Sequence, residues 1–251
     1  MTAQKLALLL LTSSLALPAL AAEQACARTP LHVFIERGQD LYLGELHGTV
    51  ETPALVRCLV TAALERKGQT LFVSLEQQPN ARDLQGDAWR GQDGRGSAAM
   101  WELTKFLLEQ EKLGRLTLHQ HVPTEFDNPF DPAAYERRMG SPLRELARRG
   151  LLIALSGNAH SRTERLPMPS PYDPAGMYAG ADLIHVDIES ASGGTSWSCM
   201  GGACGVKEFA ANTPFNHAAN TLMDGKGFGH DFVYLLPRFT ASPPKYPAVS
   251  P

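Results

Sequence analysis

The chain has 251 residues, with 23 Lys and Arg against 26 Asp and Glu, which gives a formal net charge of −3. Its basic side chains are scattered, so nothing predicts a nucleic-acid-binding surface. Beyond the N-terminus no run of 18 apolar residues occurs, so the sequence predicts no stable membrane span there. The length suits one domain of the α/β kind.

Residues 1–22 have the features of a secretory signal peptide. Lys5 supplies a positive charge, the stretch from Leu6 to Leu20 is almost wholly apolar, and small residues follow at Ala21 and Ala22. We therefore expect a periplasmic or secreted protein whose single domain spans residues 23–251. A retained N-terminal anchor is the alternative.

Four cysteines follow the signal peptide, and an even number in an exported protein predicts two disulfides. Cys199 and Cys204 are separated by only four residues, so we expect a local clip between them. That leaves a bond between Cys26 and Cys58. A thiolate metal site is the alternative use of these side chains.

In chain order, strand patterns alternate with helical patterns. The strands are expected at residues 40–44, 70–76, 116–122, 151–155, 181–188 and 232–236, and the helices at 52–67, 97–113 and 132–149. This order predicts an α/β fold with a mainly parallel, mixed sheet and helices on both faces. A long loop at 79–96 and an irregular lid or insertion near 190–230 interrupt it. In such folds ligands bind at the carboxyl ends of the strands.

Polar side chains gather where the expected strands end. They are Glu45, His47, Glu76, His119, His121, Asn158 and His160. Each one alone is compatible with a solvated turn or a half-exposed strand position. Carboxylates and imidazoles at the corresponding ends of at least three strands, however, predict one functional cluster of Glu45, His47, Glu76, Asn158 and His160.

Two carboxylates and two imidazoles suit two kinds of chemistry. Glu45, His47, Glu76 and His160 are the predicted catalytic residues, and the same four are candidate ligands of a divalent ion such as zinc or manganese that activates water. Without metal, a histidine beside a glutamate can act as a general base. No Gly-x-Ser-x-Gly elbow and no phosphate-binding glycine loop is present.

Three short motifs resemble a known superfamily. Gly44-Glu45-Leu46-His47-Gly48-Thr49, Ser74-Leu75-Glu76 and Gly157-Asn158-Ala159-His160 are similar to motifs of the grouping of ChaN-like haem-uptake proteins, TIKI-type metalloproteases and erythromycin esterases. The Gly-Glu-x-His spacing resembles most the ChaN-like branch, because the esterases place two residues between Glu and His. No lipobox precedes Cys26, unlike in lipoprotein members. The resemblance implies a mixed α/β fold with a His/Glu site, and its relatives include hydrolases, proteases and haem binders.

Two functions follow from these observations. The first is an exported hydrolase acting on a small-molecule or peptide substrate with an ester, amide or peptide bond, in which Asn158 orients the ligand or a histidine. The alternative is a periplasmic haem- or metal-binding protein without catalysis. Its ligands would be His47, His119, His121 or His160, assisted by Tyr42 or Tyr178. A structural protein is a third interpretation, and the oligomeric state is left open.

Overall fold

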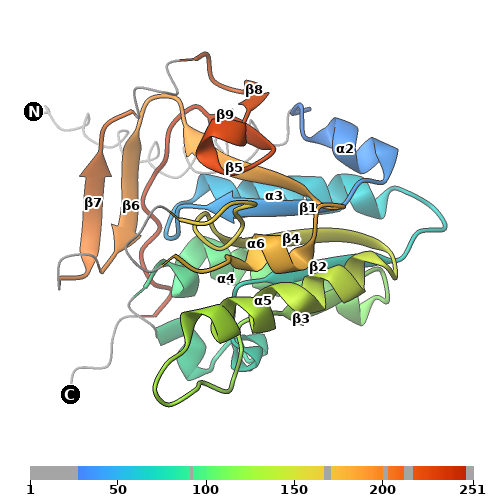
Figure 1. The fold of residues 1–251 in the computed structure, drawn as a ribbon, viewed down its shortest axis with the longest axis horizontal. Helices are drawn as coiled ribbons and strands as arrows, with labels where there is room; N and C mark the ends of the chain where they lie inside the picture. Colours follow the sequence, from blue (N-terminus) through green and yellow to red (C-terminus); the bar gives the residue numbers. More distant parts are fainter. Residues whose placement is uncertain (1–27, 91–92, 167–170, 200–202, 212–216, 247–251) are drawn as a thin grey trace, which may run out of the picture.

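The computed structural model describes residues 28–90, 93–166, 171–199, 203–211 and 217–246, so the expected signal peptide and Cys26 lie outside the described residues. A seven-stranded sheet has the order β3-β2-β4-β1-β5-β9-β8 (Figure 1). Its strands are β1 Leu41–Glu45, β2 Leu71–Leu75, β3 Thr117–Gln120, β4 Leu151–Gly157, β5 Ile184–Ser190, β8 Leu222–Asp224 and β9 Phe232–Leu236. All neighbours run parallel except β8 and β9. The predicted α/β class with a mainly parallel, mixed sheet is confirmed.

Strands β1, β2 and β4 are buried along their whole length, which explains their near-continuous apolar sequences. Alternate residues of each strand enter two different cores. Leu41 and Leu43 pack with the helices of one face, whereas Tyr42 packs on the other. The first core holds α2 His32–Arg37, α3 Glu51–Leu64 and α4 Ala98–Lys112, and the second holds α5 Pro132–Ala147 with α6 Ala175–Ala179. Figure 1 shows α5 and α6 side by side.

The register of the central strands brings their polar ends to one level. Strand β4 lies between β1 and β2, with Glu45 opposite Gly157 and Leu75 opposite Leu155. The residue after β2, Glu76, therefore lies beside the last residues of β4. This alignment brings the residues of three separate sequence motifs together at the carboxyl ends of neighbouring strands.

Helix α5 carries a carboxylate on its buried face. Asp131 caps the helix by accepting hydrogen bonds from two backbone N–H groups, and proline occupies its first position. The buried residues then recur at helical spacing: Glu136, Met139, Leu143 and Leu146. Glu136 is the acidic member of this stripe and is therefore directed toward the sheet.

The irregular parts differ from expectation. The expected loop at 79–96 contains three short 3₁₀ turns, at Pro79–Arg82, Asp87–Arg90 and Gly94–Gly96, which pack around the buried Trp89. The expected insertion contains an antiparallel hairpin of β6 Gly194–Ser198 and β7 Gly205–Phe209, which stands at one end of the molecule in Figure 1. Strand β8 also lies within it. The short helices α2 and α6 were not expected, since each spans less than two turns.

The Cys199–Cys204 disulfide at the end of this hairpin confirms the predicted clip. Cys58 is also disulfide-bonded. Its predicted partner, Cys26, lies outside the described residues.

Candidate active site

Glu45 and His47 form the first half of the site. Strand β1 ends at Glu45, one residue beyond the expected strand, so His47 lies in the turn that follows. The turn after β1 nevertheless brings the two side chains together, and His47 Nδ1 lies 2.8 Å from Glu45 Oε1. Glu45 is buried, whereas about a quarter of the His47 side chain is exposed (27%). The carboxylate therefore orients the ring and leaves Nε2 directed toward the centre of the site.

Glu76 lies at the centre of the site. Its Oε2 accepts a hydrogen bond of 2.6 Å from the Gly157 backbone N–H and lies 3.4 Å from His47 Nε2. Its Oε1 lies 3.8 Å from His160 Nε2. One buried carboxylate therefore faces the Nε2 atoms of two imidazoles.

His160 repeats the arrangement seen at His47. Its Nδ1 lies 2.7 Å from Oε1 of Glu136, which is buried on α5, and its side chain is 25% exposed. The other oxygen of Glu136 accepts the N–H of Ala175 at the start of α6. Both imidazoles are thus held at Nδ1 by a buried glutamate, and both present Nε2 to Glu76.

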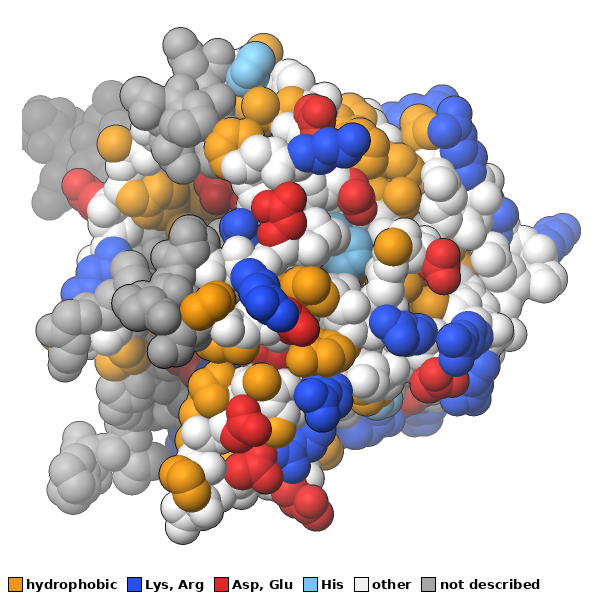
Figure 2. Space-filling model, viewed as in Figure 1, with side chains coloured by type: hydrophobic (Ala, Val, Ile, Leu, Met, Phe, Trp, Pro, Cys, Tyr) orange, Lys and Arg blue, Asp and Glu red, His pale blue; other side chains and the backbone are white. Residues whose placement is uncertain are grey.

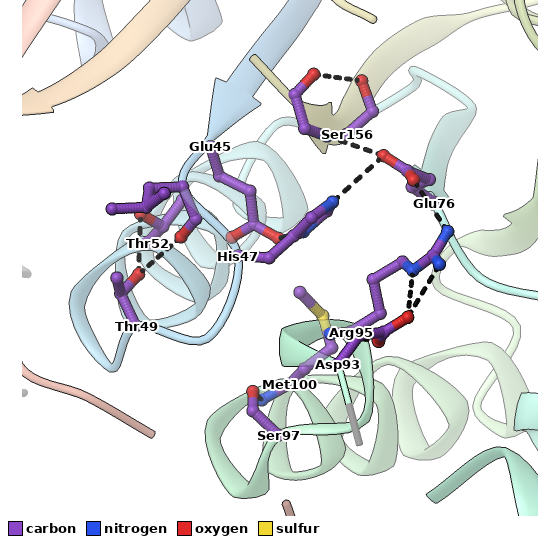
Figure 3. A network of polar contacts seen from close by, with 12 residues as sticks. Glu45, His47, Thr49, Thr52, Glu76, Asp93, Arg95, Ser97, Met100 and Ser156 are labelled. Atoms are coloured by element: carbon purple, nitrogen blue, oxygen red, sulfur yellow. Dashed lines mark hydrogen bonds and ion pairs between the residues drawn. The ribbon is translucent and has the colours of Figure 1, made fainter. Parts of the chain in front are cut away.

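Arg95 approaches the same carboxylate from the loop before α4. Its guanidinium donates to Glu76 Oε1 at 3.0 Å and to Asp93 Oδ2 at 2.7 Å. Figure 3 shows Glu76 between the His47 ring and Arg95, with Asp93 on the far side of the guanidinium. Gly94 lets this loop pack directly on the backbone of His47, because a Cβ there would lie 2.6 Å from the His47 carbonyl carbon.

These contacts shift the pKa values of the ionisable groups in the site. Burial disfavours an ionised Glu76, but the charges of His47, His160 and Arg95 outweigh it and hold the pKa of Glu76 well below its usual range. Burial also disfavours a charged His47, yet Glu76 and Glu45 raise the pKa of His47 to about 10. The pKa of His160 is also raised, against burial, by its hydrogen bond to Glu136 and by Glu76, while the positive charge of His47 opposes this rise. Burial raises the pKa of Glu45.

A cavity of about 260 Å³ opens onto the two imidazoles. It is lined by His47, Glu76, Asp93, Gly94, Arg95, His160, Trp197, Ser198 and Cys199. The loop before α4 and the clipped hairpin each supply part of the wall. Gly157 keeps the floor open, since a Cβ there would lie 3.0 Å from His47 Nε2.

Asn158 belongs to a neighbouring group, which we call the Asp187 cluster: Asn158, Ser161, Asp187 and His230. The Asn158 side chain hydrogen-bonds Asp187, so it is directed away from the cavity. His230 Nε2 lies 2.9 Å from Ser161 Oγ, and its Nδ1 lies 4.0 Å from Asp187 Oδ2. Burial raises the pKa of Asp187 to about 8 and lowers that of His230 to about 4. We therefore assign Asn158 to support of the turn that carries His160.

His119 and His121 do not contact Glu76. The Nδ1 atoms of both lie within 3.1 Å of Ser74 Oγ, and both residues line a separate cavity with Arg138 and Pro142. Burial lowers the pKa of His119, and it lowers the pKa of His121 to about 3. The structure therefore does not bring this pair into the His47–His160 site.

The residues predicted to bind metal or haem agree only in part with the geometry that such a site needs. Among the residues that the structure describes, no three His, Cys, Asp or Glu side chains are arranged to hold a metal ion. The donor types at Glu76 suit zinc, but the Arg95 guanidinium already places a cation against that carboxylate. Of the predicted haem-assisting tyrosines, Tyr42 is buried and accepts a hydrogen bond from Ser156, while Tyr178 lies beneath Arg137. Metal and haem binding stay predictions.

Sequence reasoning missed two members of the site. Glu136 had a readable signal, since it is a carboxylate in phase with the apolar stripe of a helix. Arg95 had none, because it lies in a glycine-rich loop without periodicity. We call the completed group the Glu76 cluster: Glu45, His47, Glu76, Arg95, Glu136 and His160.

Comparisons with known proteins show the fold alone. No protein-family model and no curated protein sequence matches the chain. A crystal structure of a protein from Bacillus cereus is similar, with a TM-score of 0.56 and 9% sequence identity over 91% of this chain and 99% of that one. The superfamily resemblance of the three motifs is not tested by this likeness and stays a prediction.

Proposed function

We propose that the protein is an exported hydrolase that activates water for attack on an ester, amide or peptide bond. The observation that carries the proposal is the symmetric placement of two imidazoles around one buried carboxylate, each fixed at Nδ1 by its own glutamate. Imidazoles held in this way and exposed to a cavity are the usual agents of general acid–base catalysis.

The two histidines have different roles in this proposal. His47, whose pKa is about 10, carries a proton at neutral pH. The pKa of His160 is also raised, by Glu136 and Glu76, but the charge on His47 opposes a second positive charge nearby, so we assign His160 as the imidazole that gives up its proton. Titratable groups whose environments separate their pKa values are suited to act as acid and base. His160 is then the base that takes a proton from water at Nε2. The His47 imidazolium stabilises the negative charge that develops on the carbonyl oxygen and donates its proton to the leaving group.

Glu76 and Arg95 support this division. The Glu76 carboxylate stabilises the proton on His47, and His47, His160 and Arg95 together keep Glu76 ionised in spite of its burial. Two oxygens held by Gly157 and Arg95 leave Glu76 little freedom to rotate. We therefore treat Glu76 as the residue that fixes both imidazoles rather than as the base.

The export part of the proposal rests on the N-terminal sequence and on the Cys199–Cys204 disulfide, which is compatible with an oxidising compartment. In the part of the chain that the structure describes, no helix has the length and apolar character needed to cross a membrane. Periplasmic and secreted locations are both consistent with these features.

Hydrolysis of 4-nitrophenyl acetate by the purified chain tests the proposal. We expect turnover above background that falls at least about 10²-fold in His160→Gln. The matched control is His217→Gln, which changes an exposed histidine and should leave the rate unchanged. Equal rates for the wild type and His160→Gln would contradict the proposal.

Treatment with EDTA separates the metal-free route from a metal-dependent one. Activity retained after EDTA supports catalysis by the side chains alone. Activity that is lost and then restored by zinc or manganese supports the metal-dependent form. A Soret band on titration with hemin that disappears in His47→Ala would instead support haem binding.

A further inference from the structure

The segment between β3 and α5 exposes two aromatic side chains beside the candidate site. Phe126 and Phe130 are 54% and 56% exposed, and they are among few large hydrophobic residues with such exposure in the described chain. Figure 1 shows this segment as a loop that projects from the body of the molecule. At the same place in Figure 2, hydrophobic atoms are exposed next to acidic and basic side chains.

A chain of ring contacts joins this loop to His160. Tyr135, on the first turns of α5, stacks with Phe126 at a centroid distance of 5.8 Å and contacts Phe130 at 5.6 Å. Its ring centroid lies 6.2 Å from that of His160. We call Phe126, Phe130 and Tyr135 the aromatic shelf. The shelf is thus continuous with the imidazole that we assign as the base.

Polar contacts fix the shelf on both sides. Arg138 of α5 forms an ion pair with Asp127, which lies next to Phe126. Tyr135 also hydrogen-bonds Arg95, which itself binds Glu76. The exposed rings are therefore anchored to the body of the protein and to the Glu76 cluster. A preformed apolar surface loses little conformational entropy when a ligand binds.

The surroundings of the shelf favour a small molecule over a macromolecule. Glu125 and Asp131 are exposed around it, beside the ion pair of Asp127 and Arg138, and their negative charge opposes binding to an anionic bilayer. Two exposed phenylalanines also offer far less area than the roughly 1,200 Å² that a stable protein interface buries. An uncharged ring, in contrast, can stack on the shelf while the rest of the molecule reaches the cavity.

We propose that the aromatic shelf binds an apolar, ring-bearing part of the substrate, so that the preferred substrates are esters or amides of aryl-substituted acids. This inference rests on the proposed hydrolase function. It assigns substrate preference to Phe126 and Phe130, with Tyr135 as the link to His160.

Two measurements test the shelf. The first is hydrolysis of ethyl acetate and ethyl 3-phenylpropanoate, followed in a pH-stat. We expect the wild type to prefer the phenyl ester in kcat/KM, and the double variant Phe126→Ala/Phe130→Ala to lose about tenfold of that preference, mainly through KM. The control is Leu113→Ala, which removes an exposed apolar side chain at the end of α4 and should keep the preference.

The second measurement does not depend on catalysis. Fluorescence titration with N-phenyl-1-naphthylamine should show binding that weakens about tenfold in the double variant and not in Leu113→Ala. If neither ester is hydrolysed but the titration behaves as expected, the shelf is supported and the hydrolase proposal fails. If hydrolysis occurs with unchanged preference and unchanged probe affinity, the shelf is overturned while the hydrolase proposal stands. Loss of binding to phosphatidylglycerol vesicles in the double variant, with unchanged probe affinity, would also overturn it.

Discussion

The Glu76 cluster and the Asp187 cluster lie near the same end of the sheet, but their buried carboxyl groups have opposite pKa shifts. Glu76 is buried, yet it faces two imidazoles and a guanidinium, so it stays ionised. Asp187 is equally buried, but its Oδ1 has no hydrogen-bond partner among the described residues, and its pKa rises to about 8. Burial favours the protonated carboxyl unless opposite charges and hydrogen bonds compensate for it, as they do at Glu76.

The two clusters also differ in access. His47 and His160 are each about a quarter exposed and line a cavity, whereas Asp187 and His230 are 5% and 2% exposed. A Ser161–His230–Asp187 order therefore resembles a catalytic triad only in composition, because its His–Asp distance is 4.0 Å and its serine is fully buried. Exposure together with paired charge identifies the Glu76 cluster as the candidate site.

The largest effect is expected for Glu76→Gln. The amide removes the negative charge that keeps His47 protonated and leaves Arg95 paired with Asp93 alone, so we expect kcat/KM for 4-nitrophenyl acetate to fall by about 10³-fold. The control is Glu109→Gln on the exposed side of α4, which should have the wild-type rate. A Glu76→Gln rate within threefold of the wild type would remove this residue from the proposed site.

A smaller loss is expected for Glu136→Gln. The amide still fills the space but no longer favours a charged His160, so we expect a fall of about 10²-fold and an acid limb of the pH–rate profile that moves toward lower pH. Glu145→Gln, an exposed position on the same helix, is the matched control. An unmoved acid limb would show that Glu136 does not set the pKa of His160.

The pH–rate profile of the wild type should be bell-shaped. The rate rises as His160 loses its proton, at a pH above the usual histidine value because the pKa of His160 is raised. It falls again near pH 10 as His47 loses its proton. A profile that rises through pH 6.5 and shows no alkaline limb would assign both roles to one histidine.

The smallest effect on activity is expected for Asp187→Asn, which should instead change stability. The folded state holds the Asp187 proton up to a pH of about 8, whereas the unfolded chain releases it near 3.8, so the wild type loses stability as pH rises through this window. The variant cannot lose that proton. We expect its melting temperature relative to wild type to rise by at least about 5 °C between pH 4 and pH 8. A constant difference across that range would show that Asp187 is ionised in the fold.

Much of the site was predictable from the sequence because parallel strands end at one edge. Glu45, Glu76 and His160 follow the apolar parts of β1, β2 and β4, and the observed register brings them together. The directions of side chains in the turns were not predictable. Asn158 lies two residues from His160 but faces Asp187, since no strand periodicity applies beyond Gly157.

The order of the strands in the sheet could not be predicted from the sequence either. His119 and His121 follow the same carboxyl-end pattern, but β3 is the edge strand next to β2, and both imidazoles turn to Ser74. Spacing along the chain does not reveal which strands are neighbours. Arg95 comes from a loop that packs on the backbone of His47 and Gly48 through Gly94, and this packing has no sequence period.

The central claim is that Glu76 gives the two imidazoles that line one cavity, His47 and His160, different pKa values. An NMR titration of the His47 and His160 rings in the wild type and in Glu76→Gln measures this directly. The account predicts a pKa of about 10 for His47 and a lower but raised value for His160, with the His47 value falling toward 6.5 in the variant. Titration of both rings near 6.5 in both proteins would contradict it.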